Sequence, residues 1–227
     1  MEDYKRLEYE MHLLHNEYTG GLKLGASTTI AQYVLPPLLA SFIGKFPQVS
    51  LSLLNGNSRE IEAALQEHRI DLGFVEGVFR LPNIRYTTFL EDELVAVVRT
   101  GSKLAVGEEI TPDELFHLPL VLRERGSGTL DVFERALQQH NIKLSSLQVL
   151  MYLGSTESIK LFLEHTDCLG IVSVRSITRE LYSGQLRVVE IKGMPMLRDF
   201  SFAQPQGQES GLAQVFMQFA MHNNHKL

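Results

Sequence analysis

Two hydrophobic periodicities alternate along almost the whole chain, and this alternation restricts the possible fold classes more than any other feature. Short apolar runs at residues 22–26 and 49–54 are typical of strands. Between them, from 34 to 46, apolar residues recur every three to four positions, which predicts an amphipathic helix. Pro36 and Pro37 lie inside that stretch, so the helix must kink or restart there. Alternating strands and helices predict an α/β fold with a mainly parallel sheet flanked by helices.

A second strand–helix series follows Thr100 and Gly101, so the chain carries more strands than one small sheet would hold. The strand-like segments of this series are residues 118–122, 148–153, 169–174, 186–191 and 200–202. Asn57 with Glu60, and Thr111–Glu114, have the spacing of capping boxes and predict helix starts. We therefore expect two α/β lobes.

The composition is that of an ordinary globular protein, and its charge argues against a free-standing DNA-binding module. Of the 227 residues, 44% are hydrophobic, and 21 basic against 27 acidic residues give a net charge of −6. Domains that bind DNA by themselves usually carry a basic stripe. A single cysteine, Cys168, excludes a disulfide within the chain and a thiolate zinc cluster. The chain has neither a signal-peptide pattern nor an apolar run of about 20 residues, so we expect a cytoplasmic protein with no membrane contact.

Residues 1–18 carry a heptad-like seam. Apolar or aromatic residues stand three or four positions apart, at Tyr4, Leu7, Met11, Leu14 and Tyr18. Gly20 and Gly21 then end the helical pattern. Two interpretations remain open: an amphipathic helix that lies on its own domain, or the end of a longer helix that joins two copies of the chain. A seam this short is marginal alone.

Three predicted strands are each followed by hydroxyl side chains at the start of a predicted helix. These segments are Ser27-Thr28-Thr29, Ser127-Gly128-Thr129 and Ser155-Thr156. Ligands of parallel α/β sheets bind at the carboxyl ends of the strands, where helix N-termini present free N–H groups. The segments therefore predict an anion-binding site between the lobes. Ordinary helix capping explains each of them singly, and this alternative stays open.

No catalytic or metal-binding motif stands out. The sequence has no G-x-S-x-G, H-E-x-x-H, G-x-x-x-x-G-K-[ST] or G-x-G-x-x-G. We predict no catalytic residues, no metal and no cofactor. A bound anion would need counter-charges, and five basic residues that also suit ordinary surface positions are candidates: Arg99, Lys103, Arg123, Arg125 and Arg175.

Five stretches of the chain, taken in order, carry a family resemblance. They are G-L-K-L-G-A-S-T-T-I, V-L-P-P-L-L-A-S-F-I-G-K-F-P-Q-V, I-D-L-G-F-V-E-G, R-G-S-G-T and L-G-I-V-S. As an ordered set they resemble the effector-binding domain of LysR-type transcriptional regulators. The likeness covers residues 20–222, and the preceding heptad segment resembles the end of that family's linker helix.

The resemblance implies a two-lobed fold of the type 2 periplasmic-binding-protein kind, with two crossover strands. Residues 1–19 would end the linker helix, residues 20–99 with 200–227 would form regulatory lobe I, and residues 100–199 would form lobe II. A small anion or organic acid would bind between the lobes as the effector and modulate transcription by the full-length bacterial protein. The chain would form a homodimer or homotetramer. Operator DNA would be bound only through a winged helix-turn-helix, which this sequence lacks.

The resemblance also assigns ligand contacts to particular residues. In lobe I they would come from Ser27, Thr28, Thr29, Phe74 and Glu76, and in lobe II from Ser127, Gly128, Thr129, Ser155 and Thr156. Thr100 and Gly101 would lie at the first crossover. Residues 172–175 depart from the Leu-Pro ending that is usual in the family. The family's peroxide sensors use a pair of cysteines, so the lone Cys168 argues against a thiol switch and is expected to be a small buried hydrophobe.

Two other functions fit the same two-lobed scaffold. One is a solute-binding protein of a transport system, against which the heptad segment and the missing signal peptide argue. The other is an enzyme, against which the missing catalytic set argues.

Overall fold

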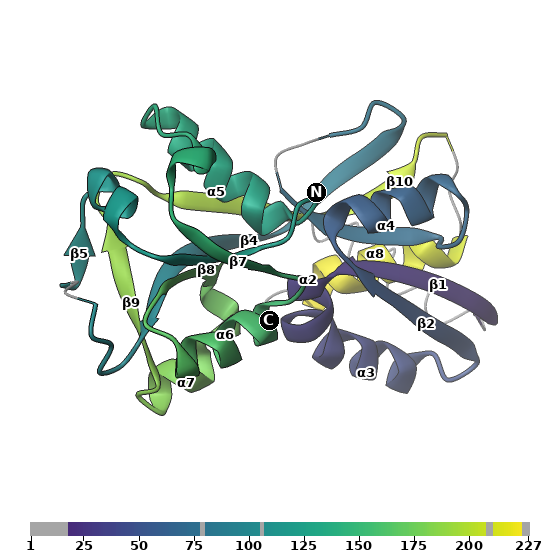
Figure 1. Ribbon diagram of the computed structural model, residues 1–227. Coiled ribbons are helices and arrows are strands. Elements are labelled where there is room, and N and C mark those ends of the chain that lie inside the picture. The colour runs from purple at the N-terminus through teal and green to yellow at the C-terminus, as the bar shows by residue number, and fades with distance from the viewer. Residues whose placement is uncertain (1–17, 78–79, 105–106, 208–210, 224–227) are drawn as a thin grey trace.

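Figure 1 shows the computed structural model of the chain, which describes residues 18–77, 80–104, 107–207 and 211–223. Most of the heptad seam lies outside these ranges, so the linker-helix interpretation stays a prediction. Tyr18, the last seam residue, packs edge-on against Phe46 with ring centroids 5.7 Å apart.

The strands form one ten-stranded sheet in the order β2-β1-β3-β10-β4-β8-β6-β7, with β9 beside β4 and β5 beside β9. Their bounds are β1 Gly20–Ser27, β2 Val49–Gly56, β3 Leu72–Glu76, β4 Ile84–Arg99, β5 Glu109–Ile110, β6 Leu120–Arg123, β7 Val149–Leu153, β8 Leu169–Ser173, β9 Leu186–Ile191 and β10 Met196–Pro205. β1 pairs in parallel with β2 and β3, and β6 does so with β7 and β8. The predicted α/β class is confirmed.

Helices cover both faces of this sheet (Figure 1). The α-helices are α2 Thr28–Tyr33, α3 Leu35–Lys45, α4 Ser58–Gln66, α5 Gly128–Gln139, α6 Thr156–His165, α7 Thr178–Tyr182 and α8 Gly211–Asn223, and the 3-10 helices are η1 Pro112–His117, η2 Leu144–Ser146 and η3 Val174–Ser176. The expected break at the two prolines takes the form of separate helices α2 and α3, which meet at Val34. Pro36 and Pro37 fall in the first turn of α3, where a missing N–H costs no helical hydrogen bond.

The first half of the structure, which we call lobe I, consists of β1–β3, α2–α4 and α8. Leu24, Phe42 and Phe216 belong to one buried cluster, formed where α2, α3 and α8 pack on the sheet. Ile61 and Leu65 of α4 belong to a separate cluster. The predicted capping box is present at the start of α4, where Asn57 and Glu60 exchange hydrogen bonds.

The second half, which we call lobe II, consists of β5–β9 and α5–α7. Phe133 of α5 lies in one buried cluster, and Ile159 and Leu163 of α6 lie in another. Cys168 belongs to the second cluster and is 1% exposed, as expected of a buried hydrophobe.

The long strands β4 and β10 connect the two lobes. β10 pairs with β3 of lobe I through residues 200–203 and with β4 along its whole length. β4 continues without a break and pairs with β8 of lobe II from Leu94 to Val97. The chain therefore crosses from lobe I to lobe II inside β4, several residues before the position expected from the sequence. Thr100 instead lies beyond the far end of β4, where its N–H donates to the carbonyl of Gln185 at 2.8 Å.

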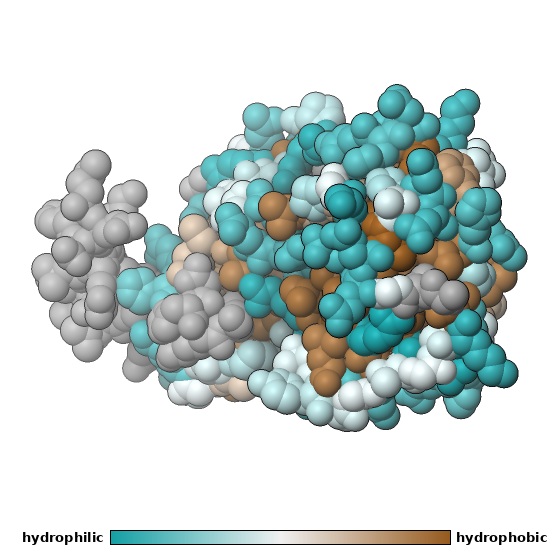
Figure 2. Space-filling model, turned by 90° about the vertical axis from the view of Figure 1, so that its left-hand side faces the viewer, coloured by the Kyte–Doolittle hydropathy of each residue, from teal (hydrophilic) through white to brown (hydrophobic). Residues whose placement is uncertain are grey.

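Exposed apolar side chains mark both edges of the sheet. Leu53 and Leu54 of β2 are each 37% exposed, and Leu150, Met151 and Tyr152 of β7 are 43–48% exposed. Figure 2, which looks onto the lobe II end, shows brown apolar surface interrupted by teal hydrophilic side chains. Of the described helices, none combines the length and apolar character needed to cross a membrane.

Candidate functional site

The carboxyl ends of the parallel strands of both lobes meet between the lobes, and two hydroxyl-rich helix starts lie there. β1 leads directly into α2, which buries Ser27, Thr28 and Thr29. β7 leads through Gly154 and Ser155 into α6, which buries Thr156. Because each helix begins within two residues of its strand, the hydroxyl groups are held at the boundary between the lobes.

Arg123, the last residue of β6, connects these two helix starts. Its guanidinium donates through Nη2 to the hydroxyl of Thr28 and through Nη1 to the hydroxyl of Thr156, each at 3.4 Å. The Nη2 atom also donates to the carbonyl of Gly154 at 3.3 Å. Thr28 belongs to lobe I and Thr156 to lobe II, so a single cation contacts both halves of the molecule.

The charge of Arg123 is buried and is paired with a partly exposed carboxylate. The side chain is 1% exposed, and its Nε and Nη2 atoms donate to the two oxygens of the neighbouring Glu124 at 2.8 Å and 3.0 Å, whose own side chain is 26% exposed. A buried guanidinium is costly unless its donors are satisfied. The hydroxyl of Ser27, adjacent in sequence to Thr28, is buried and has no hydrogen-bond partner in the described part of the chain. An oxyanion at this junction would supply an acceptor for Ser27 and a further acceptor for Arg123.

A second polar cluster fills the boundary beside the crossing strands. Arg198 of β10 forms ion pairs with Asp92 of β4 at 2.7 Å and with Glu76 of β3 at 3.2 Å, and all three side chains are at most 1% exposed. Arg198 also donates to the hydroxyl of Thr129 at 3.0 Å. Thr29 donates to the same Glu76 carboxylate at 3.4 Å. These residues pair with one another and so join the lobes, although Nη2 of Arg198 and Oε2 of Glu76 meet only in ion pairs and make no hydrogen bond within the described ranges.

Asp92 and Glu76 are further supported by neighbouring groups. Ser173 of β8 donates to Asp92 at 2.7 Å, and Arg175 lies 3.6 Å from the same carboxylate. Ser58, at the start of α4, donates to the backbone carbonyl of Glu76 at 2.8 Å. The 172–175 segment, which departs from the family pattern, therefore supports the boundary between the lobes through Ser173.

Several predicted contacts have structural roles in this arrangement. Ser127 caps α5 by accepting from the N–H of Leu130 at 3.2 Å, and Ser155 caps α6 in the same way at 3.1 Å. Gly128 lies against β3, and a Cβ at this position would stand 2.3 Å from the carbonyl oxygen of Glu76. The capping alternative therefore accounts for Ser127 and Ser155, whereas Ser27 makes no side-chain capping bond.

Three predicted positions lie away from the junction. The ring of Phe74 is fully buried in the lobe I core against Phe89, Phe202 and Phe216. Thr100 and Gly101 are exposed and follow the lobe II end of β4. They therefore lie away from the other candidate residues. The physical reason is that β4 changes partners within a continuous strand, so no turn marks the crossover.

Of the five candidate counter-charges, only Arg123 joins the two helix starts. Arg99 pairs with Asp167 at 2.8 Å, and the backbone N–H of Lys103 donates to the same carboxylate. Arg125 is exposed and lines a separate cavity beside Tyr152.

Sequence reasoning missed Arg198, Asp92 and a contact between α2 and α6. The hydroxyl of Tyr33 on α2 donates to Glu157 on α6. Its ring lies 5.3 Å from the buried ammonium of Lys160, which also pairs with Glu157 and Glu180 at 2.8 Å. One usable signal existed: Arg198 stands in phase with the buried residues Met196 and Phe200 of the same strand.

No group of three or more potential metal ligands occurs in the described ranges. The polar junction offers guanidinium and hydroxyl donors, which is chemistry suited to holding an anion.

The LysR substrate binding domain model matches residues 15–224. The uncharacterized HTH-type transcriptional regulator YeiE of Escherichia coli is 35% identical over 80% of this chain, and the match spans 61% of that protein. The HTH-type transcriptional regulator CysL of Bacillus subtilis is 26% identical over 88% of the chain and 66% of its own length. The chain thus spans about two thirds of the length of these relatives or less.

The fold is similar to that of the regulatory domain of CcmR from Synechocystis PCC6803, which was solved in complex with 2-PG. The two structures superpose with a TM-score of 0.80 and 28% sequence identity, over 90% of this chain and 97% of that chain. The expected two-lobed type 2 periplasmic-binding-protein-like fold is therefore confirmed, with its mostly parallel sheet and flanking helices. On the family match and the identity to YeiE together, this chain belongs to the LysR substrate-binding domain family.

Proposed function

We propose that this chain is the effector-sensing part of a LysR-type transcriptional regulator and that a small anion or organic acid binds at the junction of Arg123, Thr28 and Thr156. The ligand would accept from Arg123 and from the unpartnered hydroxyl of Ser27. It would contact both lobes at once and so favour one relative arrangement of them. A ligand shifts such an equilibrium only through a difference in affinity for the two states.

The observation that carries this proposal is the burial of Arg123 between hydroxyl groups from opposite lobes. Phe74, Thr100 and Gly101 are left out of the proposed site because they lie in the core or at the far end of lobe II. The CcmR regulatory domain, with 28% identity, was solved with 2-PG, which supports a small-molecule ligand in this fold.

We further propose that the chain works as a homodimer or homotetramer and that operator DNA is contacted through a helix-turn-helix of the longer protein. YeiE and CysL are HTH-type transcriptional regulators, which points away from an enzyme. The exposed apolar residues on β2 and β7 support association edge to edge, lobe I of one copy against lobe II of the other.

A thermal-shift screen tests the ligand class. We expect sulfate, phosphate or a small carboxylic acid to raise the melting temperature of the chain. At 100 times Kd, binding to the folded state adds about 2.7 kcal/mol to its stability. Arg123→Gln should abolish this shift in melting temperature. The matched control is Arg125→Gln, at an exposed arginine two positions away, and it should keep the shift. A shift that survives in Arg123→Gln would place the ligand elsewhere.

Sedimentation tests the association. The chain should sediment as a dimer or larger species, and Met151→Glu on the exposed edge of β7 should shift it toward monomer. Tyr182→Glu, at a side chain that is 91% exposed on α7, is the control and should leave the species unchanged. A monomeric wild-type chain at tens of micromolar would contradict the proposal.

A further inference from the structure

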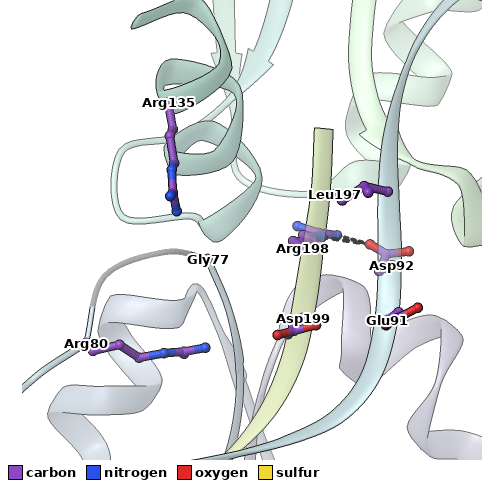
Figure 3. Close-up of a pocket in the computed structure, with 8 residues that line it drawn as sticks. All are labelled: Gly77, Arg80, Glu91, Asp92, Arg135, Leu197, Arg198 and Asp199. Carbon is purple, nitrogen blue, oxygen red and sulfur yellow. Dashed lines mark hydrogen bonds and ion pairs between the residues drawn. The ribbon is translucent and has the colours of Figure 1, made fainter. Parts of the chain in front are cut away.

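A separate cavity of about 410 Å³ lies beside the crossing strands (Figure 3). Its walls come from the end of β3, the segment after it, β4, α5 and β10, and its lining residues are Gly77, Arg80, Glu91, Asp92, Arg135, Leu197, Arg198 and Asp199. None of these residues belongs to the Arg123 junction. The volume falls in the range of about 300–1,000 Å³ that is usual for small-molecule sites.

Four of the six charged groups that line this cavity do not pair with one another. Arg198 and Asp92 form the ion pair already described, which leaves two cations and two carboxylates. Arg135 and Glu91 make no side-chain hydrogen bond or ion pair with any residue in the described ranges. Among the described residues, the Asp199 carboxylate accepts a single long bond, of 3.4 Å from the hydroxyl of Thr88. The cavity therefore carries charges of both signs, of which Arg80, Arg135 and Glu91 are exposed to solvent and Asp199 is half-buried.

The two signs are also separated in space. Figure 3 shows Arg135 extending from α5 above Gly77 and Arg80 below it on the same side of the view, while Asp199 and Glu91 lie on the crossing strands. Arg80 is held in place by a bond to the hydroxyl of Ser201 at 3.2 Å and by the ring of Tyr86 at 4.5 Å. A ligand between these walls would meet guanidinium groups at one end and carboxylates at the other.

We propose that this cavity binds a free α-amino acid with an apolar side chain. Its carboxylate would accept from Arg135 and Arg80, and its ammonium would donate to Glu91 and Asp199. A doubly negative ligand would meet the two carboxylates unfavourably, and a simple cation would leave the arginines unpaired. The apolar side chain would cover Leu197, which is 70% exposed at this cavity although it is a leucine.

The inference is independent of the proposed function, because it uses none of the residues of the Arg123 junction. Its walls do come from both lobes and both crossing strands. An amino acid bound there would therefore also contact both lobes. It would shift the equilibrium between arrangements of the two lobes, as the proposed anion at the Arg123 junction would.

Titration calorimetry of the whole chain with L-leucine tests the proposal. N-acetyl-L-leucine, which lacks the ammonium, and L-leucinamide, which lacks the carboxylate, should each bind at least about tenfold more weakly, because each loses charge-assisted hydrogen bonds. Succinate should not bind at this cavity. Saturable binding of L-leucine with this order of affinities supports the zwitterion site.

Variants locate the binding. Arg135→Gln and Asp199→Asn should each weaken L-leucine binding at least about tenfold. Arg69→Gln, an exposed arginine that pairs with Glu67, is the matched control and should not change it. Arg123→Gln should retain saturable L-leucine binding while losing the thermal shift with the anion, which separates this site from the first. Thermal unfolding of each variant checks that it is folded.

Three results would overturn the inference. The first is no saturable binding of L-leucine up to about 10 mM, far above the Kd that four charged contacts predict. The second is equal affinity for L-leucine and N-acetyl-L-leucine. The third is unchanged L-leucine affinity in both Arg135→Gln and Asp199→Asn.

Discussion

Arg123 at the end of β6 donates to the hydroxyl of Thr28 on α2 across 95 positions of sequence and across the boundary between the lobes, at 3.4 Å. The same hydroxyl donates to the carbonyl of Gly56 at 3.2 Å, so Thr28 is held from both sides. This contact requires the lobes to stand as they do in the structure. Substitutions at the Arg123 junction are therefore expected to change both the affinity for the ligand and the relative position of the lobes.

Thr28→Val and Thr156→Val keep the side-chain shape and remove the hydroxyl. We expect each to lower affinity for the anion found in the thermal-shift screen about tenfold, since both hydroxyls accept from Arg123 and orient the guanidinium that would bind the anion. Thr28→Val should also lower the free energy of unfolding by about 1 kcal/mol, because the carbonyl of Gly56 loses its donor. Calorimetry and urea unfolding measure the two effects. Unchanged affinity in both variants would mean that these hydroxyls serve only the fold.

Gly128→Ala tests the close approach of α5 to β3. A Cβ at Gly128 would lie 2.3 Å from the carbonyl oxygen of Glu76, so the lobes must shift apart, at a cost of about 1–3 kcal/mol. Urea unfolding should show this loss, and small-angle scattering should show a larger radius of gyration. Gly44→Ala is the control: nothing lies within 4 Å of its Cβ in α3, and helix propensity predicts up to about 1 kcal/mol of added stability. If Gly128→Ala kept the stability and the radius of gyration of the wild-type chain, the close approach of α5 to β3 would be contradicted.

Arg198→Met removes the cation between two buried carboxylates. Asp92 and Glu76 would be left uncompensated, which should lower the free energy of unfolding by about 3–5 kcal/mol. Arg175→Met is the comparison, because Arg175 lies 3.6 Å from Asp92 with its side chain 28% exposed, and it should cost about 1 kcal/mol or less. Chemical denaturation at neutral pH measures both. Equal losses in the two variants would show that Arg198 is not the dominant counter-charge.

The free energy of unfolding should decrease as the pH rises, because the carboxyl group of Asp131 loses its proton. Burial raises the pKa of its carboxyl from 3.8 to about 6, the charges of Glu134 and Glu62 add to this, and Arg59 opposes it. The folded chain therefore holds the proton more tightly than the unfolded chain, so this contribution is present below pH 3.8 and is lost as pH rises through about 6.

The variant Asp131→Asn should remove that dependence. At pH 7.5 it should raise the free energy of unfolding by about 1 kcal/mol, a value discounted for solvent screening, and at low pH it should have little effect. Glu190→Gln, at an exposed position on β9, serves as the control. Thermal unfolding at several pH values makes the comparison. An equal gain at pH 4 and pH 7.5 would exclude titration as the cause.

Local patterns in the sequence determined the elements of this protein. The alternation of strand and helix periodicities, the capping box of Asn57 with Glu60 and the helix break at Pro36 and Pro37 each depend on residues a few positions apart. Such interactions form within a short segment whatever the rest of the chain does, so the α/β class and most helix starts could be predicted. The same local reasoning predicted that Ser27, Thr28 and Thr156 lie at the lobe boundary. Where a helix follows a strand almost at once, the hydroxyl groups at the helix start must lie at the end of that strand.

Only the tertiary structure decided which polar groups meet and which are already satisfied. The partner of Arg198, Asp92, lies 106 positions away, and no local pattern relates them. The crossover could not be located from the sequence because β4 changes partners inside one strand without a turn. Phe74 likewise faces the core because the neighbouring β10 and α8 bring Phe202 and Phe216 onto it. Burial and long-range pairing are properties of the packed whole, and they distinguish Arg123 from the other candidate cations.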